Sequence, residues 1–322
     1  MEKILRAFFL SLSKNNMATQ FARKYGMPLG GFRFVGGESF DQLHKVVTHL
    51  NNDGLDVTID CLGEFIKTEE DAKKSTDDAI DVIRTIKEKQ LHGQISLKPS
   101  SIGLEVSNQS IIYNLQRLLE EAKKHDVFVT LDMEEYETCP RILELFKHYR
   151  KQYDNLGITL QANLKRTNQD LEDLQDLTPA IRIVKGAYNE HPDIDIDDKD
   201  KVDENYKKLV KTNLLQGSYT AVATHDDEMI TYTKKVVNEN NISTDQFEFQ
   251  MLQGMREKLQ RQLREEGYKV RIFVPFGKDW FGYFMKRMAE RPANVGFAVK
   301  TMLEKIDWRR RRGLAPSFLL LF

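Results

Sequence analysis

The chain has 322 residues, 40% of them hydrophobic, and its 48 Lys and Arg nearly balance its 49 Asp and Glu, for a net charge of −1. Because a general nucleic-acid binder carries a basic excess, this balance argues against nucleic acid as a partner. Two cysteines are too few for a disulfide framework or a Cys-rich zinc site, so we expect a reducing compartment and no metal centre. No run of 18 apolar residues occurs, which predicts a cytoplasmic protein without a spanning helix.

The chain begins with a predicted helix over residues 1–16 and a capped helix over residues 39–51. Eight β-rich runs follow, each ending in a polar cluster and each followed by a segment with helical periodicity, among them residues 108–125, 200–216 and 226–240. This is the repeat of a parallel sheet with crossover helices. The runs cover residues 56–61, 94–98, 127–132, 157–161, 180–185, 219–224, 247–252 and 269–275.

Eight consecutive strand-helix units favour an α/β fold of the (β/α)₈, or TIM, barrel type. The alternative, an open doubly wound sheet, would normally place a Gly-rich turn after its first strand, but that turn here reads DCLGEF and has a single glycine. We therefore predict one catalytic domain over residues 1–322. It comprises a helical arm (1–55), a barrel (about 56–306) and a basic and apolar tail (307–322).

Nearly every predicted strand ends in a side chain that can hydrogen-bond or carry charge. Active sites of such barrels lie at the carboxyl ends of the strands, so these residues predict one polar mouth, although each alone could be half of a structural ion pair. His225 has no second His or Cys at ligand spacing, so a cofactor hydrogen bond is favoured there over a metal. The strand-end residues are Asp60, Glu64, Lys98, Asp132, Glu134, Gln161, Asn163, Arg182, Lys185, Tyr188, Thr224, His225, Asp226, Gln250, Gln253 and Phe273.

The segment after the last strand, residues 279–304, predicts a helix with a distinctive face. Tyr283, Lys286, Arg287 and Glu290 stand at i, i+3, i+4 and i+7 and so share one side of it. That face is either solvated or lies over the barrel mouth and presents two cations to a carboxylate substrate.

The strings SLKPSSIGL, TLDMEE, ITLQANLKR, IRIVKGAY, VATHD, FEFQMLQGM, RIFVPFG and YFMKRMAERPAN, in this order, resemble the proline dehydrogenase family, in particular its single-function bacterial enzymes. The resemblance covers residues 56–294. It implies a distorted barrel that holds FAD, with the eighth helix over the mouth. It also implies oxidation of L-proline to Δ1-pyrroline-5-carboxylate, with hydride transfer from the proline ring to flavin N5 and electrons passed to a quinone.

The resemblance also assigns residues to the cofactor and to the substrate. The implied cofactor contacts are Gln161, Arg182, Val184, Lys185, Gly186, Ala187, Lys199, Thr224, His225 and Gln250. The implied substrate-site residues are Glu64, Lys98, Asp132, Phe273, Tyr283, Lys286, Arg287 and Glu290.

The sequence departs from the family pattern at two of these positions. The family usually has arginine where Lys286 stands, and a lysine keeps the charge but loses the planar fork of donors. The family usually has tyrosine where Phe273 stands, so a hydroxyl is missing. We expect both changes to affect substrate affinity or discrimination against hydroxylated proline, and neither to change the reaction.

Two other functions fit part of the sequence. A Schiff-base lyase or aldolase on the same barrel would use Lys185 or Lys98 as its amine nucleophile. A non-catalytic peripheral membrane protein would use residues 308–322, where four consecutive arginines precede the apolar end FLLLF. The same tail would allow an enzyme to make peripheral contact with the inner face of the cell membrane.

Overall fold

The computed structural model describes residues 2–13, 15, 33–63, 66–186, 188 and 190–290. The described residues form two compact units, one from positions 36–277 and the other from the positions before and after them. In this part of the chain no helix is long and apolar enough to cross a membrane. The single catalytic domain over residues 1–322, with its barrel over 56–306, stays a prediction.

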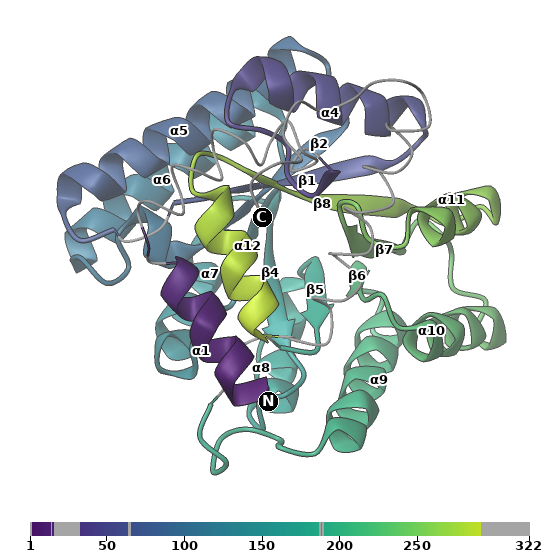
Figure 1. Cartoon of the computed structure of the whole chain (residues 1–322). Helices are drawn as coiled ribbons and strands as arrows, with labels where there is room; N and C mark the ends of the chain where they lie inside the picture. Colours follow the sequence, from purple (N-terminus) through teal and green to yellow (C-terminus); the bar gives the residue numbers. More distant parts are fainter. Residues whose placement is uncertain are drawn as a thin grey trace, which may run out of the picture. The chain divides into compact units, whose positions relative to one another are not determined.

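The larger unit is a closed barrel of parallel strands in sequence order, with β8 pairing back to β1, which confirms the predicted barrel (Figure 1). Each predicted strand is present, and its ends differ from the prediction by at most two residues. The strands are β1 (Asp56–Cys61), β2 (Gly93–Leu97), β3 (Val129–Leu131), β4 (Leu156–Gln161), β5 (Ile181–Val184), β6 (Thr220–Ala223), β7 (Phe247–Leu252) and β8 (Val270–Phe276).

Helices alternate with the strands, and several begin at side-chain caps that the sequence supplies. Ser39 accepts a hydrogen bond from the backbone N–H of Gln42, and Thr68 forms a reciprocal capping box with Asp71. The α-helices of this unit are α4 (Phe40–Asn52), α5 (Glu69–Glu88), α6 (Asn108–His125), α7 (Cys139–Arg150), α8 (Thr167–Glu172), α9 (Lys199–Leu215), α10 (Asp227–Glu239) and α11 (Glu257–Glu265). The short 3₁₀ turns are η3 (Pro99–Ile102), η4 (Tyr136–Thr138) and η5 (Gln175–Leu177).

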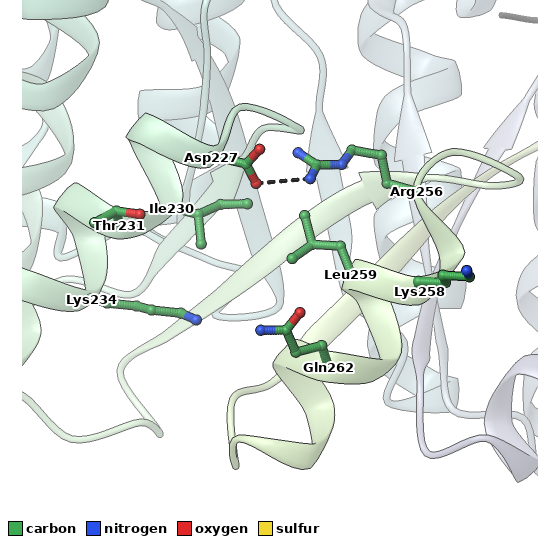
Figure 2. Close-up of a pocket in the computed structure, with 8 residues that line it drawn as sticks. All are labelled: Asp227, Ile230, Thr231, Lys234, Arg256, Lys258, Leu259 and Gln262. Atoms are coloured by element: carbon green, nitrogen blue, oxygen red, sulfur yellow. Dashed lines mark ion pairs between the residues drawn. The ribbon is translucent and has the colours of Figure 1, made fainter.

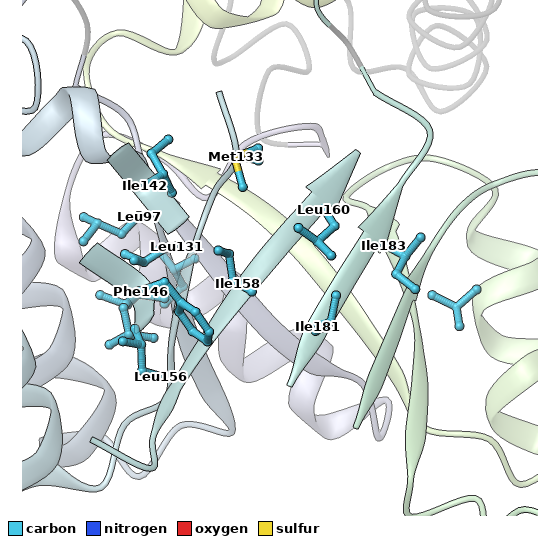
Figure 3. Packing of buried hydrophobic residues seen from close by; sticks show 14 of the residues in the cluster. Leu97, Leu131, Met133, Ile142, Phe146, Leu156, Ile158, Leu160, Ile181 and Ile183 are labelled. Atoms are coloured by element: carbon cyan, nitrogen blue, oxygen red, sulfur yellow. The ribbon is translucent and has the colours of Figure 1, made fainter. Parts of the chain in front are cut away.

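The apolar core lies between the strands and the surrounding helices. Alternate residues of a strand point to opposite faces, and those on the outer face of β2 to β5 join the buried apolar cluster together with Ile142 and Phe146 of α7 (Figure 3). The intervening residues hydrogen-bond across the inside of the barrel, as where Gln94 of β2 donates to Thr58 of β1 at 2.9 Å. The outer faces of these strands are therefore apolar, and the inner faces, which line the inside of the barrel, carry polar side chains.

The smaller unit contains α1 (Glu2–Ser13) and α12 (Trp280–Glu290). Phe9 of α1 is buried with Met285 and Ala289 of α12, and the rings of Phe34 and Phe284 lie 5.7 Å apart. The helix predicted over residues 279–304 is thus present to Glu290, and its remainder lies outside the described residues, as does the tail. Its placement over the barrel mouth stays a prediction.

The outer apolar layer should dominate the stability of the barrel. Leu118 of α6 is fully buried in the apolar cluster, so Leu118→Ala should lower the free energy of unfolding by about 2–5 kcal/mol. Leu215, at the end of α9, is 52% exposed. The same substitution there, Leu215→Ala, should change the free energy of unfolding by no more than about 0.5 kcal/mol. Urea unfolding of both variants measures the difference, and equal losses would contradict this placement of the core.

Candidate active site

The guanidinium of Arg182 lies inside the barrel and links four strands. The residue is 4% exposed and sits on β5. Its Nε donates to Oε1 of Gln250 on β7 at 2.7 Å. Its Nη1 donates to Oγ of Ser96 on β2 and to Oδ1 of Asp132, just past β3, each at 2.7 Å. Two other residues predicted at strand ends, Asp132 and Gln250, are thus in direct contact with Arg182.

One donor atom of Arg182 remains without a partner. Its Nη2 is buried and makes no hydrogen bond to any described residue. The guanidinium carbon lies 5.3 Å from the centre of the Phe273 ring, a cation–π distance. A buried polar atom normally has a hydrogen-bond partner, so Nη2 is suited to an acceptor that a bound group would bring. These features fit a flavin, whose ring carries acceptor atoms along its edge.

A second ion pair lies at the ends of β1 and β2. Lys98 Nζ contacts both carboxylate oxygens of Asp60, at 2.9 and 3.0 Å, and Asp60 is fully buried. The pairing holds the Lys98 ammonium beside the carboxyl end of β1. Asp132 is tied in separately, since Thr159 of β4 donates to its Oδ1 at 3.1 Å. Two of the residues predicted for the substrate site, Lys98 and Asp132, therefore each have a fixed partner within the barrel.

Glu134, just past β3, contacts one residue that follows β2 and another that ends β4. Its carboxylate accepts from the backbone N–H of Ser100 at 2.8 Å and from the Ser100 hydroxyl. Burial raises the pKa of the Glu134 carboxyl above its usual value, because the charged form loses hydration, although the bonds from Ser100 oppose the shift. Gln161 donates to the Glu134 carbonyl oxygen at 2.8 Å, which fixes the side chain predicted to lie beside the cofactor.

Lys185 is held between two carboxylates beyond β5. Its ammonium contacts Asp226 at 2.8 Å and also contacts Asp203, whose other oxygen contacts Lys199 at 3.1 Å. Burial alone would raise the pKa values of Asp203 and Asp226, but the hydrogen bonds and charges of their partners, Lys185 and Lys199 among them, together outweigh it, so both pKa values lie below the usual range. Lys199 is mostly exposed. This cluster brings together two predicted cofactor cations at one edge of the barrel mouth.

Gly186 allows the backbone to approach a side chain closely. Its φ is +110°, and a Cβ there would lie 1.9 Å from Oδ1 of Asn163, so only glycine fits. Val184, two residues earlier, ends β5 and is half-buried. A contact within the protein therefore requires this glycine, and the predicted cofactor contact of Gly186 stays a prediction. Ala187 lies outside the described residues.

Thr224 and His225 anchor the loop after β6. The Thr224 hydroxyl accepts from the backbone N–H of Asp226 at 3.0 Å. His225 Nε2 accepts from the backbone N–H of Leu252 at 2.9 Å, which places the imidazole proton on Nδ1. Arg256 donates to the His225 carbonyl oxygen at 2.6 Å. His225 Nε2 is therefore used within the protein, and the predicted cofactor contact of His225 stays a prediction.

The predicted carboxylate-binding residues lie on α12, in the smaller unit. Tyr283 is buried, and the guanidinium carbon of Arg287 lies 5.2 Å from the centre of its ring. Lys286 is half-buried. Of the remaining predictions, Glu64 and the side chain of Glu290 lie outside the described residues, so nothing places them.

A groove on the outside of the barrel contains none of the predicted site residues. It has a volume of about 350 Å³ and lies between α10 and α11, where Arg256 of the preceding loop pairs with Asp227 at 2.8 Å (Figure 2). Its other lining residues are Ile230, Thr231, Lys234, Lys258, Leu259 and Gln262. The converging strand-end residues, and not this groove, make the candidate active site.

The sequence reasoning missed several partners of the site residues. Ser96 and Glu248 each stand two residues before a predicted site residue, and Asp203 stands one helical turn after Lys199. Alternation along β2 and β7 could have placed Ser96 and Glu248 on the inner face. The i, i+4 spacing from Lys199 could have indicated Asp203, but its contact with Lys185 could not be predicted, because Lys185 lies on a different element.

The family model described as Proline dehydrogenase matches residues 43–300. The chain is similar to Proline dehydrogenase 2 of Bacillus subtilis (strain 168), at 44% identity over 94% of this chain and 100% of the relative. It is also similar to Proline dehydrogenase of Deinococcus radiodurans, at 38% identity over 94% of this chain and 99% of the relative.

Among solved structures, the fold is similar to proline utilization A (PutA) from Bdellovibrio bacteriovorus, inactivated by N-propargylglycine. The TM-score is 0.78 at 22% identity, over 88% of this chain and 36% of the longer one. At that identity the likeness concerns the barrel fold alone.

Gly186 provides a test of the site geometry with an internal control. Gly186 and Gly217 both have positive φ, of +110° and +80°, so alanine at either position is strained by about 1–3 kcal/mol. A Cβ at Gly217 meets nothing within 4 Å, whereas at Gly186 it would displace Asn163, which adds about 1–3 kcal/mol. Thermal unfolding should therefore show a lower Tm for Gly186→Ala than for Gly217→Ala, and the reverse order would contradict this loop geometry.

Proposed function

Because this chain belongs to the proline dehydrogenase family, we propose that it binds FAD at the carboxyl ends of its barrel strands and oxidises L-proline to Δ1-pyrroline-5-carboxylate. The family is flavin-dependent, and the chain is a proline dehydrogenase, an oxidoreductase of proline catabolism. The observation that carries the cofactor assignment is the buried, unpartnered Nη2 of Arg182. We also propose that residues 1–322 form a single catalytic domain, since the curated relatives match 94% of the chain along nearly their whole length.

The cofactor supplies what side chains lack, a group that accepts a hydride. Arg182 and Lys185 would place positive charge against its ring, where reduction adds negative charge. Gln161, fixed through the Glu134 carbonyl, would contact the ring edge, and the backbone at Gly186 would contact the cofactor. The other residues that we assign to the cofactor are Val184, Ala187, Lys199, Thr224, His225 and Gln250.

The substrate side of the site is assigned to residues that can bind a carboxylate and cover a small ring. Lys98 and Asp132 would form the floor of the proline pocket, each held by its own partner in the barrel. The proline amine must be unprotonated when the hydride leaves, because its lone pair forms the new C=N bond. Lys286 and Arg287 would bind the carboxylate. Tyr283 and Phe273 would pack over the ring, Glu64 would pair with Lys286 as a gate, and Glu290 completes the set.

The reduced cofactor must pass its electrons on, and we propose a quinone as the acceptor. A quinone resides in a membrane, so the protein would work at the inner face of the cell membrane. The tail of residues 308–322 combines four arginines with the apolar sequence FLLLF, which suits an anionic lipid surface. The tail lies outside the described residues, so its sequence alone supports this contact.

The cofactor and the reaction are tested together by one spectrum. We expect purified protein, or protein supplied with FAD, to be yellow and to lose its blue absorbance when L-proline is added without oxygen. An aldolase using Lys185 or Lys98 would be colourless and would trap substrate as a reducible imine. A protein that binds no FAD would contradict the proposed function.

Position 286 allows a sharper test of substrate binding. Lys286→Arg restores the donor fork, so KM for proline should fall with little change in kcat. The gain in substrate binding free energy should not exceed that of one charged hydrogen bond, about 1.5–3 kcal/mol. Arg287→Ala removes a carboxylate partner and should raise KM at a cost of about 2–5 kcal/mol. Steady-state kinetics with a saturating artificial acceptor measures both.

The two variants separate different failures. An equal or higher KM for Lys286→Arg would show that this side chain does not contact the carboxylate. Unchanged kinetics for Arg287→Ala would remove α12 from the substrate site altogether.

The proposed membrane contact is tested by co-sedimentation with anionic vesicles at low salt. Each arginine near such a surface contributes about 1 kcal/mol, so full-length protein should pellet with the vesicles and a variant ending at Asp307 should not. Neutral vesicles are the control. Equal pelleting of both proteins would show that the tail is not the anchor.

A further inference from the structure

A buried carboxylate lies next to the residues that contact Arg182, nearer the amino-terminal ends of the strands. Glu248 is on β7, two residues before Gln250, and is 1% exposed. Arg271 of β8 donates through Nε to both of its oxygens, at 2.8 and 3.0 Å. Tyr219 donates its hydroxyl to Oε2 at 3.0 Å. Burial alone would raise the pKa of Glu248, but Arg271 and the other donors hold it below its usual value, so this carboxylate is ionised.

The remaining contact of Glu248 leads to the active site. Gln250 donates through Nε2 to Oε1 of Glu248 at 2.6 Å, and its own Oε1 accepts from Nε of Arg182 at 2.7 Å. An ionised carboxylate can only accept hydrogen bonds, so it forces the NH₂ end of the amide toward itself. The amide carbonyl then faces Arg182. The opposite orientation would set two donors against each other, at Gln250 and at Arg182.

Arg182 is in this way fixed at two of its three nitrogens. Nε is held by Gln250, and Nη1 by Ser96 and Asp132, which leaves the plane of the guanidinium no freedom to turn. The direction of the buried, unpartnered Nη2 follows from those contacts. If Gln250 turned over, the Nε contact would be lost and Nη2 would no longer be held in one direction.

We propose that Glu248 is a positioning residue for proline oxidation. It orients the amide of Gln250, which fixes the guanidinium of Arg182 so that Nη2 faces the flavin. The inference rests on the proposed function, in which the flavin lies against Arg182. Glu248 itself contacts neither the cofactor nor the substrate.

The test is Glu248→Gln in the FAD-loaded protein, with Tyr219→Phe as the matched control. A glutamine at 248 keeps the shape but can donate to Gln250 and reverse its amide. We expect kcat for proline to fall about tenfold, which corresponds to the loss of about one oriented hydrogen bond. We also expect the midpoint potential of the bound flavin to become more negative, because a displaced cation stabilises the reduced form less. Tyr219→Phe removes a bond to the same carboxylate but leaves the Gln250 contact, and should change neither quantity.

A second variant separates positioning from folding. Glu248→Gln leaves the partly buried Arg271 without its main partner, which weakens the barrel. Combining it with Arg271→Met removes both charges of the pair and should restore Tm, while the lower kcat and the shifted potential persist. Recovery of both quantities in the double variant would overturn the proposal, as would a Glu248→Gln protein with the kcat, spectrum and potential of the parent. A parent protein that binds no FAD would instead contradict the proposed function.

Discussion

The arrangement of the site depends on one buried charge, the guanidinium of Arg182. A cation removed from water is costly unless it is paired and hydrogen-bonded. Here the carboxylate of Asp132 pairs with the guanidinium, and Ser96 and Gln250 accept further hydrogen bonds from it. These partners come from separate strands, so the pairing exists only when the barrel is closed. The interaction therefore ties the catalytic chemistry to the fold.

The need to pair this buried charge is reflected in the side chains that fill the inside of the barrel. The interior of such barrels is usually packed with branched apolar side chains. In this protein the inner face carries charged and amide side chains instead, including the ion pair between Glu248 and Arg271. Apolar burial is provided by the outer faces of the strands against the helices, where Ile158 and Phe146 are fully buried. Stability and chemistry are thus assigned to opposite faces of the same strands.

The sequence predicted the strand order and nearly all strand positions, because β-rich runs alternate with segments of helical period. The helix over residues 108–125 was predicted to the residue, since its apolar positions repeat every third or fourth residue. Its N-cap, Ser107, was not predicted and is identified by the structure, where its side chain accepts a hydrogen bond from the backbone N–H of Ser110. At the site, Lys98, Asp132 and Arg182 were predictable because parallel strands end at the same edge. The pairing of Arg182 with Ser96 was not, because it depends on which residues come level across the barrel and on the lengths of their side chains.

The account is tested most directly by a crystal structure of the protein with FAD bound. It predicts that Arg182 keeps its contacts to Asp132, Ser96 and Gln250, and that its Nη2 lies within hydrogen-bond distance of an acceptor on the flavin ring. A structure in which the flavin binds elsewhere, or in which Arg182 turns away and leaves those three partners, would contradict it.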